Sequence, residues 1–79
     1  MKVRVDVMLK NGVLDPQGKA IGRALGTMGF RGISDVRAGK VIMLDLDETD
    51  QAKALQEAKG MAEKLLANLV IEDFKVSVA

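Results

Sequence analysis

The chain has no cysteine and no histidine, which restricts how a domain of 79 residues can be stabilised. A domain this small buries only about 60% of the surface of its unfolded chain, so its own core leaves it marginally stable. Small domains usually compensate with disulfides, a structural metal or association with another chain. Without thiols and imidazoles, disulfides and most structural metal sites are excluded. The sequence therefore predicts a single domain, residues 1–79, that is supported by self-association or by a partner.

The missing residue types also limit the chemistry of the chain. Most enzymes transfer protons or attack electrophiles with His, Cys, Ser, Lys or a carboxylate, and here His and Cys are absent and serines number two. Neither Gly18-Lys19 nor Gly39-Lys40 has the upstream glycine and the following Ser or Thr of a phosphate-binding loop. We expect no catalytic residue, no cofactor and no metal on this chain, so its function lies in binding or assembly.

Charge and hydropathy exclude two further classes of partner. Lysine and arginine number 12 and aspartate and glutamate 11, so no strong net charge attracts nucleic acid or an anionic membrane. No apolar run approaches the roughly 18 residues of a membrane span, and the first ten residues alternate instead of forming a signal peptide. We expect a cytoplasmic protein without nucleic-acid or membrane contacts.

Hydrophobic periodicity predicts the element order β-α-β-β-α-β. Residues 2–10 alternate apolar and polar side chains with a period of two, which is typical of a half-buried strand. The further strands are expected at residues 33–38, 41–47 and 70–78, and the helices at residues 16–28 and 50–67. This order indicates an α+β domain with one antiparallel sheet and both helices on one of its faces.

Local signals place the turns and the helix ends. Asp15 caps the first helix with Pro16 at its first position, and Gly29 ends it in a left-handed conformation. Thr49 or Asp50 caps the second helix, and a hairpin is expected at residues 38–41. The stripes expected to face the core are Ile21, Leu25 and Met28 in the first helix, and Leu55, Ala58, Ala62, Leu65 and Leu69 in the second.

Two features point to contact with another chain. Met8, Val41 and Met43 lie on the sheet face opposite the predicted core, where side chains should be polar, so we expect them in an oligomer interface. Glycines recur at positions 18, 22 and 26 of the first helix, although each costs about 1 kcal/mol relative to alanine. They indicate close packing of this helix, either on its own sheet or against another chain.

Five segments carry a resemblance beyond periodicity: GVLDPQGKA at residues 12–20, GF at 29–30, SDVRAGK at 34–40, KLLAN at 64–68 and VIEDF at 70–74. In this order and spacing, from residue 2 to residue 78, the chain closely resembles PurS, the small subunit of bacterial and archaeal phosphoribosylformylglycinamidine synthase.

The resemblance implies a non-catalytic subunit of a ligase complex in purine biosynthesis. Such a subunit joins an ATP-dependent synthetase to a glutaminase, so that glutamine-derived ammonia converts formylglycinamide ribonucleotide to its amidine. ATP and Mg are then expected on the synthetase subunit and not on this chain. The resemblance also implies a homo-oligomer, a dimer or a tetramer.

The resembling segments fall on expected loops, where core packing does not dictate the sequence. We therefore expect six residues to dock the larger subunits: Asp15, Gln17, Gly18, Lys19, Arg37 and Lys40. The alternative is that these segments only form a helix cap and a turn. For the whole chain, the alternative function is an ACT-like regulatory domain that binds a small molecule.

Overall fold

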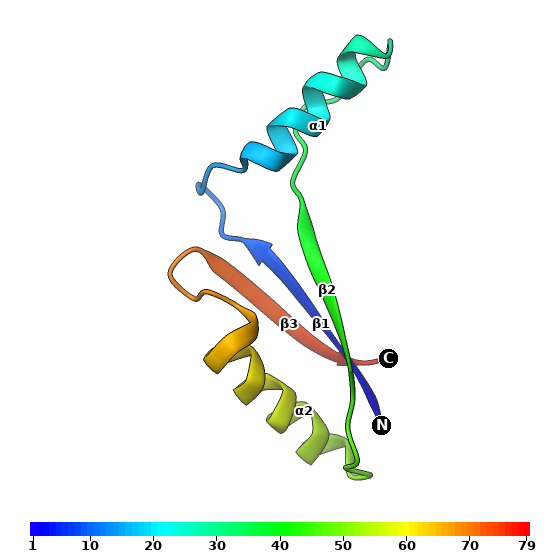
Figure 1. Cartoon of the computed structure of the whole chain (residues 1–79), viewed down its shortest axis with the longest axis vertical. Helices are drawn as coiled ribbons and strands as arrows, with labels where there is room; N and C mark the ends of the chain where they lie inside the picture. The colour runs from blue at the N-terminus through cyan, green and yellow to red at the C-terminus, as the bar shows by residue number, and fades with distance from the viewer.

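β1 (Lys2–Leu9) is the central strand of a three-stranded antiparallel sheet in the computed structural model, which describes all residues 1–79. β2 (Gly39–Asp45) and β3 (Glu72–Val78) pair with its two edges, in the order β2-β1-β3 (Figure 1). Val5 lies opposite Ile42 on one side and Val76 on the other. Because alternate residues share a face, Val5, Ile42 and Val76 point to the same side of the sheet. The period-two pattern of the first strand is confirmed.

The core lies between this inner face of the sheet and α2 (Gln51–Met61). Only nine of the 79 residues are buried, and no fully buried side chain is larger than valine. Alanines on the helix allow its backbone to approach the strands closely. The buried core residues are Val3, Val5 and Val7 of β1, with Ala54, Ala58, Ala62 and Ala67.

The second helix begins at its predicted cap but ends differently from the prediction. The Asp50 carboxylate accepts a hydrogen bond from the Lys53 N–H at 3.2 Å. α2 then passes into a π-helical turn, η1 (Ala62–Leu66), in which the Ala67 N–H donates to the Ala62 carbonyl at 2.9 Å. This wider turn rotates the side chains within it and after it. The predicted burial of Leu65 and Leu69 is therefore wrong: they are 83% and 46% exposed.

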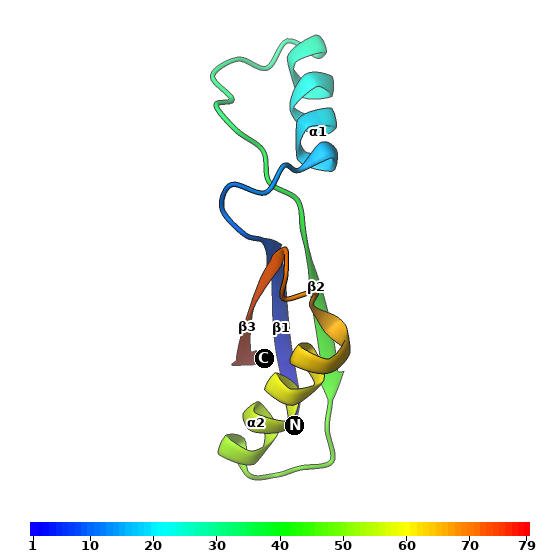
Figure 2. The same ribbon diagram turned by 90° about the vertical axis from the view of Figure 1, so that its left-hand side faces the viewer.

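α1 (Pro16–Thr27) has its predicted ends, with Asp15 as the N-cap and Gly29 at a φ of 95°. The helix does not pack on the sheet but lies beyond the end of it (Figures 1 and 2). The molecule is accordingly elongated, at 48 × 24 × 15 Å. The expected burial of the stripe on α1 is corrected, because Ile21 and Met28 are exposed.

Residues 33–38, which were expected to form a strand, run alongside α1 without a backbone–backbone hydrogen bond. They continue directly into β2, so the predicted hairpin at residues 38–41 does not form. One cause is that the Ala38 N–H, which would close that hairpin, donates to Asp15. The α+β class and the antiparallel sheet are confirmed, whereas the fourth strand and the placement of α1 on the sheet are corrected.

None of the helices combines the length and the apolar character that crossing a membrane requires.

Candidate functional site

The Asp15 carboxylate joins two segments that are far apart in the sequence. One of its oxygens accepts the Gly18 N–H at 2.8 Å and the other accepts the Ala38 N–H at 2.7 Å. Asp15 is buried although it is charged, and these two bonds compensate for the lost hydration. The donors at Gly18 and then Ala38 hold the pKa of Asp15 below its ordinary value of 3.8. Both carboxylate oxygens are thus engaged within the chain.

Arg37 also stabilises this junction, through hydrogen bonds to the segment between β1 and α1. Its guanidinium donates to the Val13 carbonyl at 2.7 Å and to the Lys10 carbonyl at 3.1 Å. Its positive charge also contributes to the lowered pKa of Asp15. We call Asp15, Arg37 and Ala38 the hinge, because they connect the end of β1, the start of α1 and the start of β2.

Two of the three spaced glycines allow α1 to approach the segment that follows it. A Cβ at Gly18 would collide with the Val36 carbonyl oxygen, and one at Gly22 would lie 3.4 Å from the Val36 side chain. No atom lies within 4 Å of the corresponding point at Gly26. The predicted close packing is therefore present at the first two glycines, although its partner is the extended segment and not the sheet.

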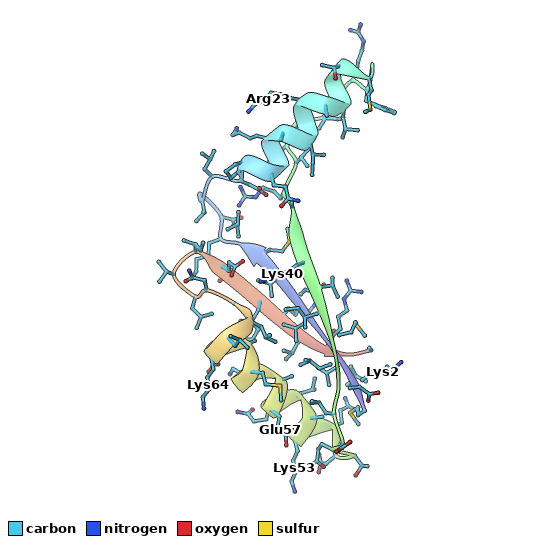
Figure 3. All side chains as sticks on the ribbon, in the orientation of Figure 1. Lys2, Arg23, Lys40, Lys53, Glu57 and Lys64 are labelled. Atoms are coloured by element: carbon cyan, nitrogen blue, oxygen red, sulfur yellow. The ribbon has the colours of Figure 1, made fainter.

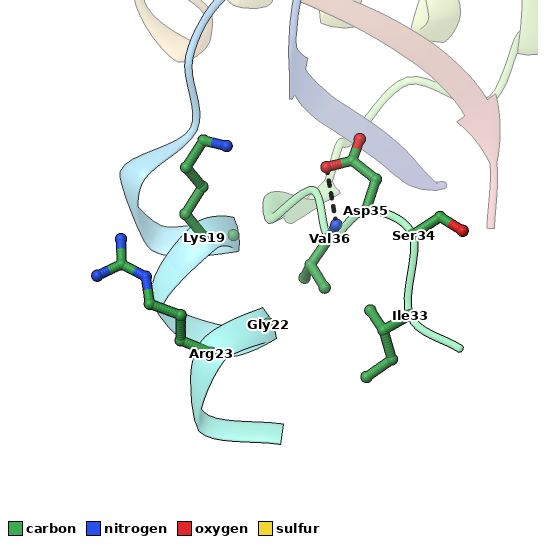
Figure 4. Close-up of a pocket in the computed structure, with 8 residues that line it drawn as sticks. Lys19, Gly22, Arg23, Ile33, Ser34, Asp35 and Val36 are labelled. Carbon is green, nitrogen blue, oxygen red and sulfur yellow. Dashed lines mark hydrogen bonds between the residues drawn. The ribbon is translucent and has the colours of Figure 1, made fainter. Parts of the chain in front are cut away.

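Three of the predicted docking residues, Gln17, Lys19 and Lys40, are exposed. Lys19 and Arg23 line a cleft of about 230 Å³ between α1 and residues 33–36, with Asp35 on the opposite wall (Figure 4). Neither Lys19 nor Lys40 forms an ion pair within the chain. The charges of these lysines are therefore available to a partner, and their docking role stays a prediction.

Asp15, Gly18 and Arg37 complete the predicted docking set, and the structure gives each a contact within the chain. Asp15 and Gly18 are buried and Arg37 is partly buried. The alternative expected for these segments is a helix cap and a turn: the cap is present at Asp15 and Gly18, whereas the chain runs from Arg37 directly into β2 without a turn.

Met8, Val41 and Met43 lie on the outer face of the sheet, where they are 42%, 50% and 53% exposed. Arg4 and Asp6 of β1 lie on the same face, opposite Met43 and Val41 of β2, and form an ion pair at 2.9 Å. The hydrogen bond from Arg4 lowers the pKa of Asp6, and the same bond raises the pKa of Arg4. The outer face is therefore a mixture of apolar and charged side chains, and its role as an oligomer interface stays a prediction.

Sequence reasoning missed the exposed apolar side chains at residues 65–71. Leu65, within η1, is 83% exposed, and Val70, in the connection between η1 and β3, is 82% exposed. A signal was present in the apolar run Leu69-Val70-Ile71, which directly follows the turn residue Asn68. The sequence prediction assigned Val70 and Ile71 to a strand that begins at residue 70, whereas β3 begins at Glu72.

The structure holds no group of three or more His, Cys, Asp or Glu side chains placed to bind a metal ion. The arrangement combines a junction held by hydrogen bonds at the hinge, exposed lysines beside it, and exposed apolar side chains on α1 and at residues 65–71.

Comparison with known sequences gives consistent matches along the chain. The sequence model of the family "PurS: Phosphoribosylformylglycinamidine (FGAM) synthase" matches residues 2–79. The PurS subunit of Mycobacterium leprae is 51% identical over 73 residues, which are 92% of this chain and 89% of that protein. The PurS subunit of Bacillus subtilis is 47% identical over 77 residues, which are 98% of this chain and 90% of that protein.

Solved structures agree with the sequence matches. PurS of Methanocaldococcus jannaschii, a subunit of formylglycinamide ribonucleotide amidotransferase, has a TM-score of 0.87 at 39% identity. That alignment covers 96% of this chain and 92% of the other. A chain from the PurLQS structure of Thermotoga maritima also has a TM-score of 0.87, at 33% identity, over 96% of this chain and 93% of that one.

Proposed function

The chain belongs to the PurS family of phosphoribosylformylglycinamidine (FGAM) synthase subunits in purine biosynthesis, and we propose that it bridges the synthetase and glutaminase subunits of that enzyme. It contributes no catalytic residue of its own, in keeping with its lack of His and Cys. ATP and Mg belong to the synthetase subunit in this proposal.

The observation that carries the proposal is the likeness to a chain of the PurLQS structure, over 96% of this chain. A relative that takes up the same fold within such an assembly supports a corresponding place for this protein. The exposed side chains of Gln17, Lys19 and Lys40 are the candidates for contact with the larger subunits.

A bridging subunit has a physical task even without chemistry. Ammonia released by a glutaminase is protonated or lost to solvent unless the synthetase site receives it directly. A subunit bound to both enzymes fixes their relative orientation, and such positioning converts an encounter through solution into a transfer within one complex. This function requires rigid junctions. The four hydrogen bonds made by Asp15 and Arg37 at the hinge form such a junction.

Self-association is part of the proposal. A core of seven buried apolar residues is small for a domain that has no disulfide, and apolar side chains such as Phe30 and Leu65 remain exposed. We therefore propose a homo-oligomer, and we place it in the cytoplasm because a cysteine-free chain needs no oxidising compartment.

Assembly tests the bridging role directly. The purified synthetase and glutaminase subunits are run on a sizing column with and without this chain, in the presence of Mg-ATP and glutamine. Co-elution that depends on the chain is the expected result. Equal co-elution without it would contradict bridging. A thermal shift of the isolated chain with a metabolite would instead favour the ACT-like alternative, because a ligand that binds only the folded state stabilises it.

A further inference from the structure

The connection between β1 and α1 contains the dipeptide Asn11-Gly12, and both of its residues are exposed. The Val13 N–H donates to the Lys10 carbonyl at 3.1 Å, which closes a turn around this dipeptide. Gly12, the third residue of the turn, has a φ of 85°, and no other residue of the turn has a positive φ. These features are typical of a type II turn, in which glycine occupies this position. The structure therefore presents Asn11 and Gly12 to solvent in a tight turn.

The two groups of this dipeptide that can react with each other are free. Gly12 lies outside the helices and strands, and its N–H donates no hydrogen bond within the chain. The side-chain amide of Asn11 forms none either. No atom lies within 4 Å of the point that a Cβ on Gly12 would occupy, so no packed neighbour holds the glycine in place. Its wide backbone freedom allows the glycine nitrogen to approach the side chain that precedes it.

Asparagine is one of the thermolabile residue types, and we propose that Asn11 is a site of spontaneous deamidation in this protein. The nitrogen of Gly12 loses its proton to hydroxide and attacks the side-chain amide carbon, Cγ, of Asn11. The new N–Cγ bond closes a cyclic imide, the Cγ–Nδ2 bond breaks, and the leaving nitrogen takes a proton from water and departs as ammonia. Water then opens the imide at either of its two carbonyls, which gives aspartate or isoaspartate at position 11.

Isoaspartate lengthens the backbone inside the turn, because the chain then runs through the former side chain and gains a methylene group. Arg37 donates to the carbonyls on the two sides of the dipeptide, to Val13 at 2.7 Å and to Lys10 at 3.1 Å. The guanidinium is a rigid fork, so it holds both carbonyls only at a fixed separation and orientation. The longer connection changes both, and at least one of these hydrogen bonds is lost. Deamidation at Asn11 therefore loosens the hinge.

The turn lies in one of the two connections between α1 and the sheet, and residues 28–38 are the other. Figure 3 shows Arg23 on α1 beyond the end of the sheet, whereas Glu57 lies on α2 beside the sheet. We expect isoaspartate at position 11 to free α1 relative to the sheet, while the core between β1 and α2 stays intact. This change is independent of the bridging role proposed above, since it requires only the turn and solvent.

Mass spectrometry of aged protein tests the modification itself. The folded chain is incubated at neutral and at mildly alkaline pH, sampled at intervals and digested. The peptide that contains Asn11 should gain the mass difference between OH and NH2, several-fold faster at alkaline pH, because the reaction begins with loss of the Gly12 proton. Isoaspartate in the product is detected by methyl transfer from S-adenosylmethionine with an isoaspartyl methyltransferase. No gain of mass at Asn11 would overturn the proposal.

The chain contains its own control in Asn68, which is the only other asparagine. Its side-chain oxygen accepts from the Val70 N–H at 3.1 Å, and the bulky Leu69 follows it. Asn68 should therefore keep its amide while Asn11 loses its own, and equal gains at the two positions would overturn the assignment. Asn11→Gln is the matched variant, because its longer side chain would have to close a larger ring that forms more slowly. Deamidation of this variant at the wild-type rate would contradict the imide route.

Hydrogen exchange, followed by NMR, tests the effect on the hinge. In the isolated isoaspartyl form, the N–H groups of Val13 and Ala38 should exchange at least about tenfold faster than in the wild type, while that of Val5 in the central strand stays unchanged. Freshly prepared Asn11→Asp carries the same new charge without the longer backbone, so its exchange at Val13 and Ala38 should remain close to that of the wild type. Unchanged exchange in the isoaspartyl form, or equal acceleration in Asn11→Asp, would overturn the loosening by a lengthened turn.

Discussion

The carboxylate of Asp15 accepts a hydrogen bond from the N–H of Ala38 at 2.7 Å, although 23 positions separate the two residues. This bond fixes how the first helix leaves the sheet, because the other oxygen of the same carboxylate caps that helix at Gly18. A single side chain therefore sets both the start of α1 and the path into β2. The following predictions begin from this junction.

Asp15→Asn is expected to loosen the hinge. The asparagine side chain has one acceptor oxygen and one NH2 donor, so it cannot accept from both Gly18 and Ala38. One of these amides then loses its partner, and its hydrogen exchange, followed by NMR, should accelerate at least about tenfold, the factor that corresponds to 1.4 kcal/mol. Asp35→Asn is the matched control, because Asp35 is exposed and accepts only from its neighbour Val36. Unchanged exchange at both Gly18 and Ala38 would contradict this role of Asp15.

Acid should weaken the folded state through Asp15. Its pKa is lower in the folded chain than its ordinary value of 3.8, so the folded state favours the ionised form. The resulting stabilisation is complete above the unfolded pKa and is lost as the pH falls below about 4 through the folded pKa. Urea unfolding followed from pH 7 to pH 3 should show a smaller loss of stability for Asp15→Asn than for the wild type. Equal losses in the two proteins would show that Asp15 does not carry this dependence.

Gly18→Ala and Gly26→Ala should have opposite effects on stability. The added methyl group at Gly18 meets the Val36 carbonyl, and such overpacking typically costs about 1–3 kcal/mol. At Gly26 no atom lies within 4 Å, so alanine should stabilise the helix by up to about 1 kcal/mol. Free energies of unfolding from urea titrations test the pair. Equal effects at the two positions would argue against close packing between α1 and residues 33–38.

Lys19→Ala combined with Lys40→Ala is expected to weaken assembly of the synthase without changing the fold. Both lysines are exposed and form no ion pair within the chain. Their replacement therefore breaks no ion pair of the folded chain and removes only charge that could contact the larger subunits. We expect the affinity for the larger subunits to fall by about tenfold, which corresponds to 1.4 kcal/mol. Lys53→Ala, an exposed lysine on α2, is the control. Circular dichroism verifies the fold, and undiminished affinity in the double variant would exclude these lysines as docking residues.

The elements that could be predicted from the sequence are those whose signals are local. The alternation in β1, the caps at Asp15 and Asp50 and the terminating Gly29 each depend on residues within a few positions. Leu65 could not be placed correctly because the π-helical turn that contains it leaves no mark in the 3.6-residue pattern.

The path of residues 33–38 depends on a contact across 23 positions, between Asp15 and Ala38, which no local pattern encodes. The same contact explains why part of the candidate site escaped sequence reasoning. The sequence prediction places Asp15 and Arg37 in one docking set with Lys19 and Lys40, because all four lie in segments that resemble the family. The structure distinguishes these residues by burial. Asp15 and Arg37 form hydrogen bonds with the backbone of their own chain, whereas Lys19 and Lys40 are exposed to solvent. Burial of a charged side chain in a loop is a tertiary property and has no sequence signature.

The most direct test of the bridging role is FGAM synthesis by the purified synthetase and glutaminase subunits, with and without this chain. Glutamine and free ammonia are supplied in separate assays. The account predicts glutamine-driven synthesis only when the chain is added, while ammonia-driven synthesis by the synthetase persists without it. Full glutamine-driven synthesis in the absence of the chain would contradict the proposal that it couples the two sites.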